Sequence, residues 1–412
     1  MVKLKNLAND TNQSLNEQMN YSKKVFETLL KNIVMQFNAR YQKEVETRRR
    51  LHNRLIELLG NIRVFCRIRP LNINEKNQRK LIRSDPVDSG IVIAQTSSGE
   101  KKFTCDKVFG ECSTQSDLFD EVGPIITSCM DGYNVCIFAY GHTGSGKTYT
   151  MEGPDCDPGI NLRSLKQLFK CTAERDECDW KISISALEIY NEKIRDLLSK
   201  SKESLCIRVQ SSGALDIPGL TSIEVHDVAG VNKVTAMTEL NDHSSRSHAI
   251  VRVTVYSVNR TTKATRQGRL NLVDLAGSER VYQSGATGQQ LKEAQSINKS
   301  LSELGNVVNA LRQRYQHIPF RNCQLTRLLE DCLNGDSKTL MIVQIAPGSA
   351  NLQDSLSSLN FAEKVGRIQT SAVATTMHGH TVLPSKTVKA TDAEHLECHS
   401  TMIYHNDEKL GV

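Results

Sequence analysis

Residues 135–148 read VCIFAYGHTGSGKT, and this stretch decides the fold. The apolar run Val135 to Ala139 is typical of a buried strand, and GHTGSGKT after it satisfies the pattern GxxxxGK[ST] of a phosphate-binding loop. A chance match somewhere in about 400 residues has a probability on the order of one in a hundred, even before a preceding strand is required. A strand that runs into such a loop predicts an α/β protein that binds a nucleotide.

The loop has the residue types that phosphate binding needs. Its glycines let backbone N–H groups turn toward phosphate oxygens without Cβ clashes, and the start of a helix adds partial positive charge. The Lys147 ammonium can lie between the β- and γ-phosphates, and the Thr148 hydroxyl can ligate Mg²⁺. The expected nucleotide-binding residues here are Gly141, His142, Thr143, Gly144, Ser145, Gly146, Lys147, Thr148 and Tyr149.

Two further segments have chemistry that suits phosphate. VDLAG at 273–277 closes an apolar strand with an acid and a glycine, and taken alone it is most often an ordinary exit from a strand. The loop upstream favours another interpretation: Asp274 holds Mg²⁺ through water, Gly277 approaches a γ-phosphate, and Glu279 follows on the same turn. NDHSSRSH at 241–248, just before an apolar strand, is by itself a polar loop.

Strands alternate with helices between about Asn61 and Thr370. We expect strands over 62–68, 134–139, 181–189, 249–258, 269–275 and 339–345, and helices over 116–128, 162–173, 292–314 and 324–333. Several inner strands are continuous apolar runs, as sheets covered on both faces require. The order predicts an α/β domain over 61–370, with a mixed central sheet flanked by helices.

The first 60 residues predict a coiled-coil helix. Apolar residues fall at spacings of seven, four, three and four: Met19, Phe26, Leu30, Ile33 and Phe37. The register is lost across 38–50 and resumes with Leu51, so we expect one long helix with a stutter that ends at Gly60. The alternative is an amphipathic helix packed on the domain behind it, because so short a seam is a marginal dimeriser.

Composition excludes several classes of protein. Of 412 residues 39% are apolar, and the net charge is +6, with Lys and Arg spread among nearly as many Asp and Glu. This argues against a general nucleic-acid binder. No apolar run approaches the ~20 residues of a membrane span, and the twelve cysteines contain no CxxC pair, so we expect a cytoplasmic protein with reduced thiols. We expect a disordered polar tail over 371–412, its histidines solvated rather than metal-bound.

Together these motifs resemble the kinesin motor family. GHTGSGKT, NDHSSRSH and DLAGSE at 274–279 are similar to its P-loop, switch I and switch II, in the same order. RIRP at 67–70 resembles its adenine-side strand end, EIYNE at 188–192 its central strand exit, and HIPFRN at 317–322 its microtubule-facing segment. RLHNRL at 50–55 and LGNIRVFCR at 59–67 resemble the neck junction of the kinesin-14 group, whose C-terminal motors usually move toward the minus end.

The resemblance implies a motor that couples ATP hydrolysis, stimulated by microtubules and requiring Mg²⁺, to movement along the track. It implies a homodimer or heterodimer through the N-terminal coiled coil, on cytoplasmic microtubules or the spindle. The implied catalytic residues are Ser245, Arg246, Gly277 and Glu279; the Mg²⁺ ligands are Thr148, Ser245 and Asp274; and the nucleotide site also takes in Arg67, Arg69 and Pro70. Arg246 would pair with Glu279 only when the switches close, and Lys299, Arg321 and Arg327 would face acidic tubulin.

The chain departs from the family pattern at several positions. His142 stands where the family usually has Gln, a change that a loop working through backbone groups should tolerate and that bears on nucleotide affinity. Gln324 and Asn334 stand where the family usually has Lys and Gly, and the loss of one positive charge predicts weaker microtubule binding. The segment between Val225 and Asn241 is short by on the order of ten residues, nearly three helical turns. Two alternatives therefore stay open: a microtubule-binding isoform with impaired ATP cycling, and a P-loop regulatory enzyme with no filament partner.

Overall fold

The computed structural model of the chain describes residues 2–199, 201, 203–210, 215–227, 230, 246–279, 288–333 and 337–368. Ser245 with the rest of 241–245, most of the short segment before it, Asn334 and the tail over 371–412 lie outside the described residues. Predictions that concern these positions remain predictions.

A nine-stranded sheet runs through the described part of the chain. Its order is β11 (Ile223–Val225), β7 (Cys178–Tyr190), β12 (His248–Asn259), β13 (Thr265–Asp274), β6 (Asn134–Tyr140), β14 (Lys338–Ile345), β1 (Ile62–Ile68) and β5 (Lys107–Phe109), with β8 (Lys193–Asp196) paired to β7. Neighbouring strands from β13 to β5 are parallel, and the remaining pairs are antiparallel. The predicted mixed sheet is confirmed.

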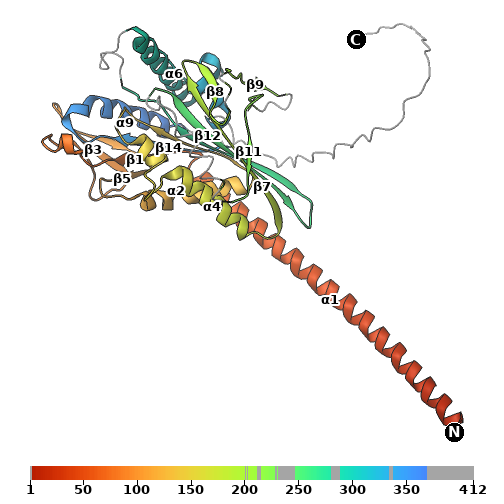
Figure 1. The fold of residues 1–412 in the computed structure, drawn as a ribbon. Helices are drawn as coiled ribbons and strands as arrows, with labels where there is room; N and C mark the ends of the chain where they lie inside the picture. Colours follow the sequence, from red (N-terminus) through yellow and green to blue (C-terminus); the bar gives the residue numbers. More distant parts are fainter. Residues whose placement is uncertain are drawn as a thin grey trace, which may run out of the picture. The chain divides into compact units, whose positions relative to one another are not determined.

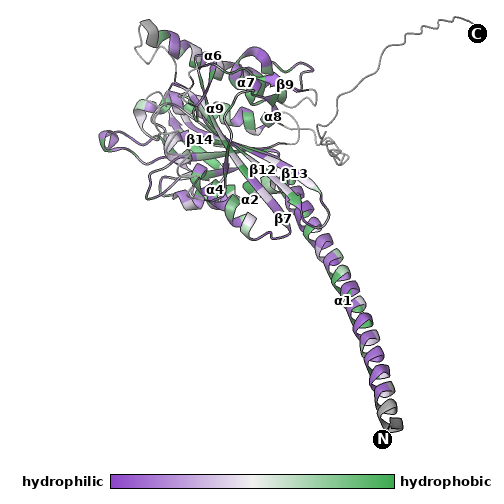
Figure 2. Ribbon diagram, turned by 45° about the vertical axis from the view of Figure 1, so that its right-hand side comes forward, coloured by the Kyte–Doolittle hydropathy of each residue, from purple (hydrophilic) through white to green (hydrophobic). Residues whose placement is uncertain are grey.

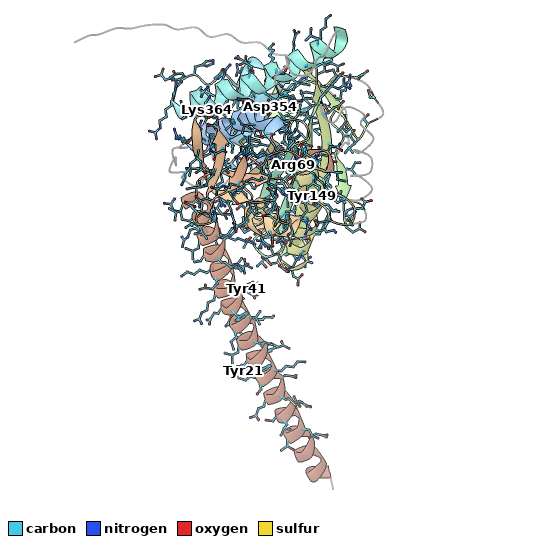
Figure 3. All side chains as sticks on the ribbon, turned by 90° about the vertical axis from the view of Figure 1, so that its left-hand side faces the viewer. Tyr21, Tyr41, Arg69, Tyr149, Asp354 and Lys364 are labelled. Atoms are coloured by element: carbon cyan, nitrogen blue, oxygen red, sulfur yellow. The ribbon has the colours of Figure 1, made fainter. Side chains whose placement is uncertain are left out.

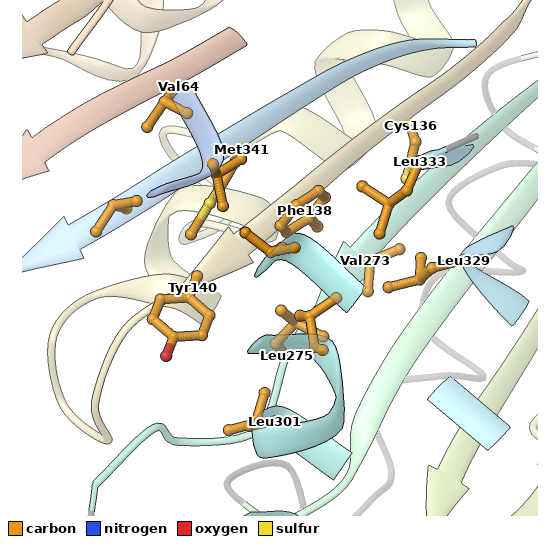
Figure 4. Packing of buried hydrophobic residues seen from close by; sticks show 14 of the residues in the cluster. Val64, Cys136, Phe138, Tyr140, Val273, Leu275, Leu301, Leu329, Leu333 and Met341 are labelled. Atoms are coloured by element: carbon orange, nitrogen blue, oxygen red, sulfur yellow. The ribbon is translucent and has the colours of Figure 1, made fainter. Parts of the chain in front are cut away.

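Helices cover both faces of this sheet (Figure 1). One face carries α2 (Gln115–Met130) and α4 (Ile160–Ala173); the other carries α6 (Gly288–Arg312), α7 (Gln324–Leu328), α8 (Glu330–Leu333) and α9 (Leu352–Gly366). Strand β6 serves both layers, because its side chains alternate: Val135 and Ile137 pack in the first, Cys136 and Phe138 in the second. Figure 4 shows Phe138 and Met341 in the second layer with Leu301 and Leu333.

The predicted strands and helices are present, with bounds shifted by a few residues. One prediction is wrong in part: the helix expected over 324–333 is two short helices, because the backbone turns out of helical geometry at Leu329. Two small sheets had no prediction. They are β2 (Ile82–Ser84), β3 (Ile91–Thr96) and β4 (Gly99–Thr104), and the pair β9 (Arg208–Val209) and β10 (Leu215–Asp216).

Helix α1 (Val2–Leu58) is continuous over 57 residues. It ends at Gly60, where φ is +105°, a conformation that favours glycine, and the Gly60 N–H bonds the Glu57 carbonyl at 3.1 Å. The apolar side chains of the predicted seam are exposed, with Phe26 at 66% and Phe37 at 67%. Figure 2 shows these apolar positions along α1, and Figure 3 labels Tyr21 and Tyr41 on the same stretch.

The last part of α1 packs on the domain through buried polar side chains. Arg49 lies 3.4 Å from Asp131 and 3.1 Å from Glu177, and the Asn53 amide donates to Asp131 at 3.1 Å. Arg175 donates to the same Asp131 carboxylate at 2.9 Å. Packing on the domain, the alternative to a coiled coil, therefore describes the end of α1, whereas the seam residues Met19 to Phe37 are exposed in the described part of the chain.

No helix among the described residues is long and apolar enough to cross a membrane. The cysteines of the described part are free, and most are buried, whereas Cys112, Cys156 and Cys206 are exposed. These three lie in turns and loops.

Candidate nucleotide site and switch region

The phosphate-binding loop lies where β6 ends and α3 (Lys147–Met151) begins. Strand β13 lies parallel beside β6, with Asp274 in register with Ala139, so β13 ends at the start of the loop. Two segments far apart in the sequence therefore meet at the carboxyl edge of the sheet, where ligands of open α/β sheets bind.

The glycines of the loop have conformations that other residues adopt with strain: φ is +79° at Gly144 and +105° at Gly146. Gly141 is needed for space as well, since a Cβ there would lie 2.6 Å from both the Gln344 carbonyl oxygen and the Ser145 hydroxyl. The backbone thus forms a close cradle, as binding of phosphate by N–H groups requires.

Lys147 and Thr148 follow the cradle and face Asp274. The Lys147 ammonium donates to the carbonyls of Gly141 at 2.9 Å and His142 at 3.1 Å, and burial lowers its pKa. The Thr148 hydroxyl donates to Asp274 Oδ2 at 2.7 Å, whereas Asp274 Oδ1 is buried with no partner in the described part of the chain. Burial raises the pKa of Asp274.

This donor set fits a nucleotide with Mg²⁺. An ammonium and a ring of backbone amides suit phosphate oxygens, and a hydroxyl beside a carboxylate with an unused oxygen suits Mg²⁺ or its waters. The described residues contain no group of three or more His, Cys, Asp and Glu side chains placed to hold a metal by themselves. Two of the three predicted ligands, Thr148 and Asp274, are together, and Ser245 lies outside the described residues.

A cavity of about 420 Å³ opens beside the loop, lined by Arg67, Arg69, Pro70 and Tyr149 among others. Arg67 donates to Gln115 at 2.7 Å, and its guanidinium lies 5.2 Å from the centre of the Tyr149 ring. Arg69 donates to the Gly144 carbonyl at 2.8 Å; Figure 3 labels Arg69 and Tyr149 near each other. Three residues of the segment predicted for the adenine side, and Tyr149 from the predicted phosphate-binding stretch, thus line one cavity.

Sequence reasoning missed Glu75, which holds Arg69 in place. The Arg69 guanidinium donates to both Glu75 oxygens, at 2.5 and 2.7 Å, and this pair lowers the pKa of Glu75 to about 2. A glutamate six residues beyond an arginine gives no recognisable pattern. Only the 3-10 turn Ile73–Glu75 brings the two together.

Glu279 contacts the phosphate-binding loop directly. Its carboxylate accepts the Thr143 N–H at 2.8 Å and the Thr143 hydroxyl at 2.6 Å. Burial acts to raise the pKa of Glu279, but the donors from Thr143 outweigh it, and the net shift is downward. Gly277 lies against this contact, since a Cβ there would be 2.2 Å from Glu279 Oε2 and from the Thr143 hydroxyl.

The amides of the switch II turn have different partners. Leu275 N–H donates to the Ala139 carbonyl at 3.3 Å, Ala276 N–H to His248 at 3.1 Å, and Ser278 N–H to the Gly141 carbonyl at 3.1 Å. Within the described residues the Gly277 N–H donates no hydrogen bond. The Gly277 N–H can therefore donate a hydrogen bond to a ligand.

Arg246 does not meet Glu279 in this structure. Its guanidinium donates to Glu293 of α6 at 2.8 Å, and the Glu293 side chain is only 6% exposed. Both members of the predicted switch pair are thus held by other partners, Thr143 for Glu279 and Glu293 for Arg246. This arrangement is the open form of the pair, and sequence reasoning missed Glu293, which carries no motif signal.

The three basic residues predicted to face a partner lie near one another in the fold. Lys299 is exposed on α6, Arg321 is exposed on the turn Phe320–Asn322, and Arg327 is half-buried on α7, the helix that contacts α6. Glu303 of α6 links these elements by accepting from Asn322 at 2.7 Å. Gln324, at the position of an expected lysine, begins α7.

A phosphate cradle after β6, an acid at the end of the parallel neighbour β13 and a turn that contacts both define a P-loop nucleotide-binding protein of the α/β class. The kinesin motor domain family matches residues 67–368. The chain belongs to the kinesin motor family.

Sequence similarity to known kinesin-like proteins indicates the group within the family. The chain is 54% identical over 380 residues to kinesin-like protein klp-3 of Caenorhabditis elegans, covering 89% of this chain and 64% of that protein. It is 42% identical over 389 residues to kinesin-like protein KIN-14S of Arabidopsis thaliana, covering 90% and 51%. These similarities support membership of the kinesin-14 group. The chain spans less than two thirds of the length of these relatives.

Solved structures agree with the fold. A structure described as the C-terminal motor and motor homology domain of Kar3Vik1, fused to a synthetic heterodimeric coiled coil, is similar with a TM-score of 0.75 and 40% identity. It covers 85% of this chain and 99% of its own. A structure described as a fast kinesin has a TM-score of 0.72 and 34% identity, covering 80% and 99%.

Proposed function

We propose that this chain hydrolyses ATP, in a reaction stimulated by microtubules, and uses the cycle to move along them, toward the minus end. The observation that carries the proposal is the link between the site and α6. Glu279 is bonded to the phosphate-binding loop, and Arg246 is bonded to α6, the helix with Lys299 at its surface. A nucleotide that breaks the Glu279–Thr143 contact frees Glu279 to pair with Arg246. That pairing in turn breaks the contact between Arg246 and Glu293 of α6.

We propose that different residues of the site bind the adenine, the phosphates and Mg²⁺. Arg67, Arg69, Pro70 and Tyr149 would bind the adenine side, and the amides of 141–146 with Lys147 would bind the phosphates. Thr148, Asp274 and Ser245 would hold Mg²⁺, which neutralises phosphate charge when bound. The Gly277 N–H, which has no partner among the described residues, would respond to a γ-phosphate.

Closure requires an exchange of partners. For Arg246 to reach Glu279, Thr143 must release Glu279 and Glu293 must release Arg246. The second release leaves a nearly buried carboxylate on α6 without its cation, which favours a shift of that helix. We propose that this shift changes how Lys299, Arg321 and Arg327 meet the acidic track.

The direction and assembly rest on α1. It precedes the motor domain, as in the kinesin-14 group, and its last part is bound to the domain by Arg49 and Asn53, so that it can act as a lever. The exposed seam before it suits a dimer with a second copy or a related chain; the Kar3Vik1 structure is described as fused to a synthetic heterodimeric coiled coil. We place the protein on cytoplasmic microtubules, including those of the spindle.

The test is ATP turnover of the purified chain with and without stabilised microtubules, with Lys147→Ala as control. Strong stimulation that the control abolishes supports the motor cycle. Microtubule pelleting without stimulated turnover would instead favour the isoform with impaired cycling, which the short segment between Val225 and Asn241 suggests. Gliding of polarity-marked microtubules over the surface-bound chain gives the direction, and plus-end movement would contradict the proposal.

A further inference from the structure

His248, the first residue of β12, lies between the switch II turn and α6 at the end of switch I, and is only 2% exposed. Its Nδ1 accepts the Ala276 N–H at 3.1 Å, and its Nε2 lies 2.8 Å from the Ser300 hydroxyl of α6. Arg246, the switch I end of the open ion pair, is two residues before it. The imidazole therefore bridges the switch II turn and α6 directly, at the base of switch I.

The hydrogen bonds determine the tautomer of this ring. The Ser300 hydroxyl donates its one proton to the Ile297 carbonyl at 2.7 Å, so it must accept from His248. Nε2 therefore carries the proton, and Nδ1 has the lone pair that the Ala276 N–H needs. Burial first, then the charge of Lys147, lowers the pKa of His248 to about 3, so the ring stays neutral over the physiological range.

Both contacts lie at positions that matter for the cycle. Ala276 immediately precedes Gly277, whose N–H has no partner among the described residues, so a movement of Gly277 toward a ligand pulls on the Ala276 peptide. Ser300 is seven residues after Glu293 on α6, about two turns, which puts both on the same face of that helix. The ring joins the phosphate-sensing turn to the helix face that also holds Arg246.

We propose that His248 is a positioning residue that transmits movement of the switch II turn to α6, in parallel with the exchange of the Arg246 pair. This inference rests on the proposed function, because the readout of α6 is the microtubule-stimulated step. The alternative is a purely structural histidine, which packs in the core and completes the hydrogen bonds of Ala276 and Ser300. The two differ in what happens when one hydrogen bond is removed and the other is kept.

Three variants separate the two bonds. His248→Asn keeps an acceptor near the position of Nδ1 for Ala276 but is too short to reach Ser300. His248→Gln keeps a donor near the position of Nε2 but offers no acceptor to Ala276, and Ser300→Ala removes one bond while leaving the ring in place. Ser355→Ala is the matched control, because Ser355 is a buried helix serine bonded to a carbonyl, that of Ala346, outside this path.

The first readout is ATP turnover with and without microtubules, beside binding of a fluorescent ATP analogue and thermal melting. We expect the three variants to bind the analogue within about two-fold of the parent chain, and the control to behave like the parent. In these three variants the maximal stimulation of turnover by microtubules should decrease by a factor of about five to 150, the range of ordinary coupling between sites. Variants that melt as the parent does and keep its stimulation would overturn the proposal.

The second readout needs no microtubules, so it separates failure of this inference from failure of the proposed function. Hydrogen exchange is followed in peptides covering 272–279 and 291–300, with and without a non-hydrolysable ATP analogue. In the parent chain we expect the analogue to change exchange in both peptides. In His248→Asn and Ser300→Ala the change should persist in 272–279 and be smaller in 291–300, where the Arg246–Glu293 contact still acts.

The two readouts together distinguish the role of His248 from the proposed motor function. Coupled exchange in a parent chain that microtubules do not stimulate would leave the role of His248 standing and remove the motor. A parent chain whose 291–300 peptide does not respond to the analogue, or variants in which that peptide responds as strongly as in the parent, would show that the histidine only fills the core. If the His248 variants fail to fold, Ser300→Ala alone carries the test.

Discussion

Replacing Glu293 by glutamine tests the open form of the switch pair. Glutamine has the same shape, so it can still accept from Tyr190, whose pKa the Glu293 hydrogen bond raises, but it removes the charge that holds Arg246 at 2.8 Å. A hydrogen bond to a charged group contributes about 1.5–3 kcal/mol. Because the Arg246 side chain is 37% exposed, solvent reduces this contact to about 1–2 kcal/mol.

Removing that contact shifts the equilibrium toward the Arg246–Glu279 pair by roughly five- to 30-fold, since 1.4 kcal/mol corresponds to a factor of ten. We therefore expect Glu293→Gln to raise ATP turnover without microtubules several-fold and to reduce the stimulation that microtubules add. The assay is steady-state turnover against microtubule concentration.

The matched control is Glu363→Gln, which breaks the exposed Glu363–Arg367 pair of α9 and should change neither value. A Glu293→Gln variant with parental basal turnover, or with basal turnover lowered alongside parental stimulation, would refute the partner exchange.

Three further outcomes follow from the site and the α1 junction. Gly277→Ala should leave nucleotide binding nearly intact but lower turnover by about a hundred-fold, because a Cβ that clashes with Glu279 and Thr143 would push the Gly277 N–H away from the γ-phosphate; parental turnover in a steady-state assay contradicts this. Asp131→Ala should cost about 3 kcal/mol and lower the melting temperature, since Arg49 and Arg175 lose their shared buried carboxylate; an unchanged melt would show that the cluster does not hold α1. The folded-state pKa of Glu75 is depressed to about 2 from 4.5, so its stabilisation is present above pH 4.5 and is lost as pH falls toward 2. Acid unfolding of Glu75→Gln should therefore lack that part of the pH dependence, and a curve parallel to that of the parent chain would contradict the assignment.

The fold was largely predictable because its signals are local. An apolar strand such as Val135 to Ala139 must be buried, and a glycine-rich loop with lysine and threonine after it has one common use. The six predicted strands and the two-layer covering follow from such runs. The split at Leu329 and the small sheet of β2, β3 and β4 were not predictable, because short elements depend on what packs against them.

The site residues also differ in whether a local motif could predict them. Lys147, Thr148 and Asp274 belong to motifs, and the structure brings them together at the edge of the sheet. Glu293, Glu75 and the role of Ser300 have no motif, since each acquires its meaning from a partner that is near in space. Arg246 and Glu279 were expected to pair only when the switches close, and the structure shows them apart, each with another partner.

The sequence by itself determined the class of protein, the nucleotide chemistry and the long N-terminal helix, because residue type, spacing and periodicity suffice for these. The tertiary structure alone decided which side chains restrain the switches and where α1 is held. Asp131 binds Arg49 and Asn53 of α1 together with Arg175, and His248 joins Ala276 to Ser300, which lie 24 positions apart in the chain. Such contacts depend on burial and distance, which the fold creates and no local pattern of residues records.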